Sequence, residues 1–125
     1  LADRESFGAA GGIGFGLTFF FPVEIEMGAK WFFEKISIES KIKSADIIIT
    51  GEGKYDSQST SGKGSFELLQ LARKHGKKTA LITSGEVGKE SGFDQVILLP
   101  ELDFGESGFK IKARKNLKKA VFSNF

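Results

Sequence analysis

The sequence contains no cysteine and only one histidine, His75, among its 125 residues. A chain without cysteine forms no disulfide bond and offers no thiolate to a metal ion. A single imidazole also excludes a zinc site built from several histidines. The lack of cysteine is compatible with a reducing compartment, and we expect a cytoplasmic protein.

Long apolar runs are missing as well. The longest, IGFGLTFFFPV, is much shorter than the roughly 20 residues that cross a bilayer as a helix. No basic segment followed by a hydrophobic core marks a secretory signal. We therefore expect no membrane as a partner.

Charge of one sign is also scarce, because the formal net charge is only +2. So small an excess gives no reason to expect nucleic acid as a partner. Six of the eighteen basic residues lie between Lys110 and Lys119, and we interpret them as the exposed face of a terminal helix. The packed face of that helix would be an apolar stripe: Phe109, Ala113, Leu117, Ala120 and Val121.

The composition itself is that of a globular protein, with 40% hydrophobic and 27% charged residues. The length suits a single domain. The chain begins with Leu1 and its one methionine is Met27, so we expect a segment of a longer protein. We treat residues 1–125 as a single α/β segment of that protein.

Three short apolar runs predict β-strands, at residues 46–50, 79–83 and 95–99. The first, DIIIT, is continuous and β-branched, as expected for a strand that is covered on both faces. A helical pattern separates it from the second strand, and strand–helix–strand units form parallel crossovers. The sequence therefore predicts an α/β fold of three layers, with helices on both faces of a mostly parallel sheet.

Helix boundaries can be read from a few residues. In SFELLQLARKHG the apolar positions have helical spacing, and Gly76 is placed to end the helix. His75 beside it suits the negative end of the helix dipole better than catalysis. Residues 28–45 also look helical, with a break or an N-cap at Ser37.

The segment GAAGGIGFG is rich in glycine, which costs about 1 kcal/mol relative to alanine in a helix interior. The many glycines of this segment need an explanation, and two explanations remain open. A helix could pack closely against a neighbour there, or a ligand could approach closely. The glycines of the segment are Gly8, Gly11, Gly12, Gly14 and Gly16.

Two polar loops follow the first two strands, at residues 51–64 and 84–92. In an open parallel sheet, ligands bind beyond the carboxyl ends of the strands. The first loop carries glycines that allow close approach of an anion, hydroxyl groups that can bind phosphate, and the cation Lys63 near the next helix. Its acids, Glu52 and Asp56, would repel an anion unless Mg²⁺ lay between them or one of them accepted a proton from a substrate hydroxyl.

The familiar nucleotide-binding motifs do not fit this loop. A Walker A motif would need glycine where Ser57 stands and serine or threonine where Gly64 stands. A G-x-G-x-x-G motif fails because Asp56 takes the place of its third glycine. The residues alone indicate a site for an anion or a metal-bound phosphate.

Two segments together resemble the bacterial glycerate kinase family of type I. The stretch ADIIITGEGKYDSQSTSGKG resembles the family pattern A-D-[LI]-[VI]-[IV]-T-G-E-G-[RK]-x-D-x-Q-[TS]-x-x-G-K, and FGAAGGIGFGL resembles its upstream G-A-A-G-G-x-G segment. The resemblance implies a two-domain α/β enzyme that phosphorylates D-glycerate with ATP and Mg²⁺. This chain would be its carboxyl-terminal portion, lacking the amino-terminal domain and inactive alone.

The resemblance also implies the site residues. It assigns catalysis to Glu52, Asp56 and Lys63, with Asp56 as the Mg²⁺ ligand. It assigns contacts with substrate or phosphate to Gly8, Gly11, Gly12, Gly51, Gly53, Lys54, Gln58 and Gly62.

The chain departs from the family pattern in three places. Lys54 replaces the usual arginine and so loses bidentate phosphate geometry. Ser59 replaces threonine, and Gly64-Ser65 replaces an Ala-Pro pair before the helix. None of these changes removes a charged group.

Two other interpretations stay open. The chain could be a non-catalytic α/β module that binds an anionic metabolite or a partner domain. It could also be a phosphate-binding regulatory domain of another kinase-like enzyme.

Overall fold

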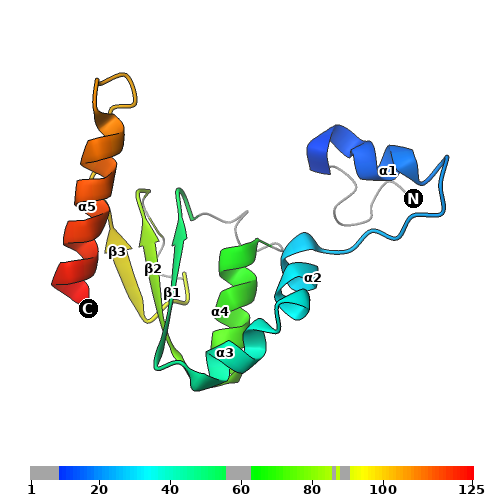
Figure 1. Ribbon diagram of the computed structural model, residues 1–125, viewed down its shortest axis with the longest axis horizontal. Coiled ribbons are helices and arrows are strands. Elements are labelled where there is room, and N and C mark those ends of the chain that lie inside the picture. Colours follow the sequence, from blue (N-terminus) through cyan, green and yellow to red (C-terminus); the bar gives the residue numbers. More distant parts are fainter. Residues whose placement is uncertain (1–8, 56–62, 86, 88–90) are drawn as a thin grey trace.

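The computed structural model describes residues 9–55, 63–85, 87 and 91–125 (Figure 1). Helices and strands alternate through the middle of the chain, and further helices lie at both ends. The elements are η1 (Ala9–Gly12), α1 (Ile13–Leu17), α2 (Gly28–Lys35), α3 (Ile38–Ser44), β1 (Ile47–Glu52), α4 (Gly64–Lys74), β2 (Lys78–Thr83), β3 (Gln95–Leu98) and α5 (Phe109–Asn124). Among the helices in these ranges, none is long and apolar enough to cross a membrane.

The described strands form one parallel sheet in the order β1-β2-β3, which confirms the predicted strands and their direction. The largest difference from the predicted boundaries is at the end of β1. Gly51 and Glu52 belong to β1 and not to the following loop, because they pair with Ile82 and Thr83 of β2. Glu52 therefore starts from a fixed strand position.

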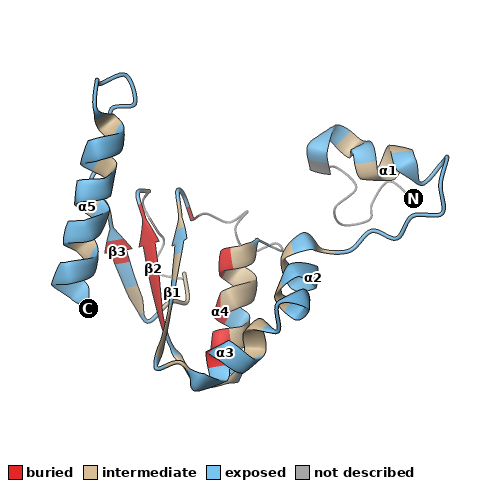
Figure 2. Ribbon diagram, viewed as in Figure 1, coloured by how far each residue is buried: buried red, intermediate tan, exposed pale blue. Residues whose placement is uncertain are grey.

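Helix α4 covers one face of the sheet, and its inner side forms the core with β2 (Figure 2). Leu69 and Ala72 on this helix and Leu81 on β2 are buried. The helix ends as predicted at Gly76, which has a φ of +59°. The amides of Gly76 and Lys77 donate to the carbonyls of Arg73 and Ala72, a Schellman motif that satisfies the helix end.

Helix α5 lies on the opposite side of the sheet from α4 (Figure 1). It reaches the sheet through Leu117, which shares a cavity with Ile82, and through a hydrogen bond from Gln95 to Asn124 of 3.1 Å. The predicted three-layer architecture is thus confirmed. The predicted apolar stripe is only partly covered, since Leu117 and Val121 keep 43% and 38% exposure, while the six basic residues are exposed as expected.

The helical region before β1 breaks at Ser37, as predicted. Ser37 has a φ of +49° and lies between α2 and α3. It occupies the N-cap position of α3 but its side chain makes no capping bond, because its backbone is left-handed and not extended as a capping serine requires. Ile42 of α3 is buried and anchors this helix beside α4.

The glycine-rich segment forms η1 and α1, which pack mainly on each other and lie apart from the sheet (Figure 1). Ala10, Gly11 and Gly12 all have positive φ values, of 49°, 69° and 85°. Glycine adopts such a conformation at little cost, and this accounts for Gly11 and Gly12. Close packing does not account for Gly11, since no described atom lies within 4 Å of a Cβ built on it.

Candidate active site at the carboxyl ends of β1 and β2

The loops that follow β1 and β2 are joined at one carbonyl group, as the sheet topology requires. The carbonyl oxygen of Gly53 accepts hydrogen bonds from the Ser84 hydroxyl at 2.7 Å, the Ser84 amide at 3.3 Å and the Thr83 hydroxyl at 3.3 Å. These contacts confirm that the two predicted loops meet at one edge of the sheet. They also fix the backbone directly after Glu52.

Glu52 connects the end of β1 to the start of α4. Its Oε2 atom accepts a hydrogen bond from the Ser65 hydroxyl, and its Oε1 atom lies 3.1 Å from Nζ of Lys63. The Glu52 side chain is 18% exposed and that of Lys63 46%. A carboxylate at the amino terminus of an eleven-residue helix is also favoured by the helix dipole. The structure thus brings together two of the three predicted catalytic residues.

Lys54 lies two residues after the end of β1 and contacts the second loop. A Cβ built on Gly85 would lie 3.2 Å from Cγ of Lys54, so the glycine permits this close approach. Gly53, in contrast, has no described atom within 4 Å of such a Cβ, and Gly51 meets only the Ile82 carbonyl at 3.6 Å. Gly51 and Gly53 therefore leave space beside the strand end.

A cavity of about 410 Å³ lies at this edge of the sheet. Glu52 and its neighbours in β1, the end of β2 and Leu117 of α5 form its walls. The walls are mainly apolar, and their polar side chains are those of Thr50, Glu52, Thr83 and Ser84. A mostly apolar pocket with a few polar groups is typical of a small-molecule site.

Tyr55, three residues after Glu52, is buried. Its ring is 5% exposed and packs edge-on against Phe93, with ring centroids 5.5 Å apart. The buried hydroxyl has no hydrogen-bond partner among the described residues. Burial and the nearby Glu52 carboxylate raise the pKa of Tyr55, so the phenol stays neutral.

Several predicted site residues are not brought into this region by the described structure. Gly8, Asp56, Gln58 and Gly62 lie outside the described residues. Gly11 and Gly12 are described, but they belong to η1, which lies apart from the sheet (Figure 1). Their contact with a ligand stays a prediction.

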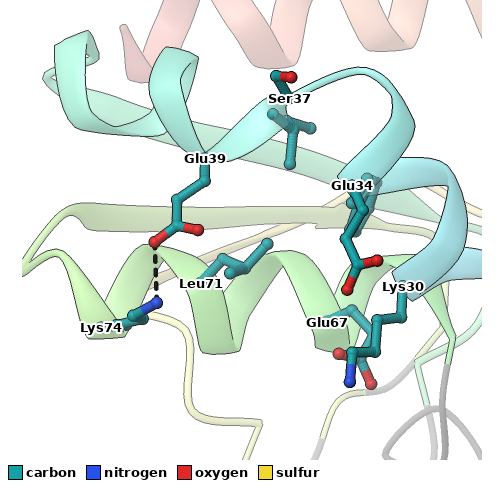
Figure 3. A pocket seen from close by; sticks show the side chains of 9 residues that line it. Lys30, Glu34, Ser37, Glu39, Glu67, Leu71 and Lys74 are labelled. Atoms are coloured by element: carbon teal, nitrogen blue, oxygen red, sulfur yellow. Dashed lines mark hydrogen bonds and ion pairs between the residues drawn. The ribbon is translucent and has the colours of Figure 1, made fainter.

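A larger cavity, of about 730 Å³, lies between α2, α3 and the outer side of α4 (Figure 3). Its walls carry two lysines and three glutamates, and Lys74 Nζ bonds Oε1 of Glu39 at 2.8 Å. The same glutamate oxygen lies 2.6 Å from Nε2 of His75. His75 thus serves structure at the end of α4, in agreement with its predicted role, and this cavity contains none of the predicted site residues.

Three hydroxyl residues of this region were not predicted: Ser65 in the first turn of α4, Thr83 at the end of β2 and Ser84 directly after it. Each acts through a neighbour, since they bond Glu52 or the Gly53 carbonyl. Their positions at the end of β2 and in the first turn of α4 were the available signal.

The family model described as "Glycerate kinase family" matches residues 1–120 of the chain. Among curated proteins, the glycerate kinase of Bacillus subtilis is 36% identical over 73 residues, covering 58% of this chain and 19% of the relative. The glycerate 2-kinase of Escherichia coli is 37% identical over 75 residues, covering 60% and 20%. The glycerate kinase of Halalkalibacterium halodurans is 33% identical over 96 residues, covering 77% and 24%.

A solved structure agrees with these relatives. The crystal structure of a protein assigned as glycerate kinase 2 from Salmonella typhimurium LT2 superimposes with a TM-score of 0.65 at 26% identity. The match covers 91% of this chain and 30% of that protein. The chain thus spans about a fifth of the length of the curated relatives it matches, and under a third of the solved one.

Proposed function

This chain belongs to the glycerate kinase family, and we propose that the complete protein transfers a phosphoryl group from ATP to a hydroxyl group of D-glycerate. Residues 1–125 would supply the carboxyl-terminal part of its active site. The observation that carries the proposal is the position of the T-G-E-G segment. This segment lies at the end of β1 and lines a cavity. Lys63, the N-cap residue of α4, lies at the same edge of the sheet and pairs with Glu52.

The described residues suit the binding of an anion. Phosphoryl transfer requires from a protein mainly positioning and charge stabilisation. ATP and glycerate are both anions, Lys63 places an ammonium group beside Glu52 at the strand end, and Lys54 follows Gly53 in the chain. Gly51 and Gly53 leave the backbone accessible there. We propose that Lys63 and Lys54 neutralise a phosphate or carboxylate group, and that ATP supplies the phosphoryl group transferred.

Mg²⁺ does not fit the described residues by themselves. No group of three or more acidic or histidine side chains in the described ranges could hold a metal ion. The Glu52 carboxylate already bonds Ser65 and pairs with Lys63. We therefore derive no step through Mg²⁺, and Asp56 remains our prediction for its ligand.

The test is glycerate-dependent release of ADP by the complete polypeptide that contains these residues. We expect activity in the wild type and a loss of at least about a hundredfold in kcat for Asp56→Asn, the cost of removing a general base or a metal ligand. Asp46→Asn, the same exchange at the opposite end of β1, should leave activity unchanged. A wild-type protein without activity on D-glycerate would reject the proposed function, and full activity of Asp56→Asn would reject only the role of Asp56.

The chain on its own should be inactive with ATP and D-glycerate, because it would hold only part of the site. Release of ADP by residues 1–125 alone, at a rate close to that of the complete protein, would contradict this division of the site.

A further inference from the structure

We propose that Ser65 is a positioning residue that holds the Glu52 carboxylate and, through it, the ammonium group of Lys63. The inference rests on the proposed function, because it assigns to Lys63 the binding of an anionic substrate group. It adds a residue that the site prediction did not contain.

The contacts of Glu52 connect two elements. Glu52 ends β1, while Lys63 is the N-cap residue of α4 and Ser65 lies in its first turn. Each carboxylate oxygen makes one of these contacts: Oε2 accepts a hydrogen bond from the Ser65 hydroxyl, and Oε1 lies 3.1 Å from Nζ of Lys63. Two separate contacts on one planar group fix its orientation better than either contact alone.

The exposed fraction increases from Ser65 through Glu52 to Lys63. Ser65 is 7% exposed, the Glu52 side chain 18% and the Lys63 side chain 46%. Only the last of the three is open enough to meet a ligand from solution. The Ser65 hydroxyl therefore acts through Glu52 and not on a substrate.

The charges support the same role. Lys63 occupies the N-cap position of α4, where the helix dipole disfavours a cation. The Glu52 carboxylate offsets this repulsion and keeps the ammonium group at the helix start. Without the Ser65 hydroxyl, Oε2 of Glu52 would lose this donor, and the orientation of the carboxylate would be held less firmly.

The first measurement is steady-state kinetics of the complete protein. For Ser65→Ala we expect the KM of one of the two anionic substrates to rise about tenfold with kcat nearly unchanged, the pattern of lost uniform binding. Ser65→Thr, which keeps a hydroxyl group, should restore most of the affinity. Ser44→Ala removes a hydroxyl that bonds the Lys41 carbonyl within α3 and serves as the control.

The second measurement needs no activity. The rate at which an amine-acylating reagent modifies Lys63, followed by mass spectrometry, should rise several-fold in Ser65→Ala and in Glu52→Gln. The rate at Lys118, exposed on α5, should not change. Should the wild type fail to phosphorylate D-glycerate, the labelling would still test the positioning role.

Unchanged labelling of Lys63 in a folded Ser65→Ala protein would overturn the proposal. So would an equal fall of kcat in the alanine and threonine variants, since that result would indicate a packing role for Ser65. If Ser65→Ala does not fold, Glu52→Gln and Ser65→Thr decide the outcome by the same labelling assay.

Discussion

The hydroxyl group of Ser84 donates a hydrogen bond of 2.7 Å to the carbonyl oxygen of Gly53. This bond joins the residue after β2 to the residue after β1. The main chain reinforces it, because the Ser84 amide donates to the same oxygen at 3.3 Å. The turn that carries Glu52 and Lys54 is therefore held by the neighbouring strand end.

Replacing Ser84 with alanine should loosen that turn without unfolding the protein. Ser84 is exposed, so the loss of its side-chain bond should reduce the free energy of unfolding by only about 1 kcal/mol. The relative loss of activity should exceed the relative loss of the free energy of unfolding. The reason is that Lys54 and Glu52 flank the Gly53 carbonyl, which Ser84 bonds. Chemical denaturation and kinetics of Ser84→Ala and Ser44→Ala, an exposed hydroxyl of α3, would separate the two effects. Equal activity in both variants would contradict a role for the Gly53 contact.

Gly53→Ala tests whether a ligand approaches the turn closely. No described atom lies within 4 Å of the added Cβ, and the φ of Gly53 is not in the left-handed region. We expect a thermal midpoint within about 2 °C of the wild type. A rise of KM at unchanged stability would then support contact between the new methyl group and a substrate. A folded variant with wild-type KM values for ATP and glycerate would remove Gly53 from the list of binding residues.

The sheet and α4 could be predicted from the sequence because local signals and tertiary packing agree there. The run Ile47–Ile49 is apolar and β-branched, and Gly76 supplies the one left-handed residue that ends α4. The extension of β1 to Glu52 was not predicted, because glycine and glutamate have low strand propensity. Pairing with Ile82 and Thr83 overrides that propensity.

The candidate site was predictable only where a residue carries charge or breaks a pattern. Lys63 and Glu52 were found in this way, and the structure pairs them. Ser65 and Ser84 were missed because serine is common in loops and at helix starts for reasons unrelated to ligands. Only the fold shows that their hydroxyl groups reach Glu52 and Gly53.

Tyr55→Phe should not destabilise the protein. The Tyr55 hydroxyl is buried without a partner among the described residues, and burying an unbonded hydroxyl is unfavourable. Its removal should leave the free energy of unfolding unchanged or raise it by up to about 1 kcal/mol. Tyr55→Ala should cost about 3 kcal/mol or more, because the contact with the Phe93 ring is lost as well. Denaturant titrations of both variants check this, and a clear destabilisation by Tyr55→Phe would indicate a hydrogen-bond partner for the hydroxyl in the complete protein.

The link between α3 and α4 should make stability depend on pH in the acid range. Hydrogen bonds from Lys74 and then His75 lower the pKa of Glu39 from 4.5 to about 2. Because the folded state favours the ionised carboxylate, the contribution of Glu39 is complete above pH 4.5 and is lost as the pH falls from there to about 2. We expect wild type to melt above Glu39→Gln at pH 7, with the difference shrinking steadily through this window. Glu34→Gln, on the wall of the same cavity but without a bond to Lys74 or His75, is the matched control. A difference between wild type and Glu39→Gln that stays constant from pH 7 to pH 2.5 would show that the carboxylate charge does not hold these helices together.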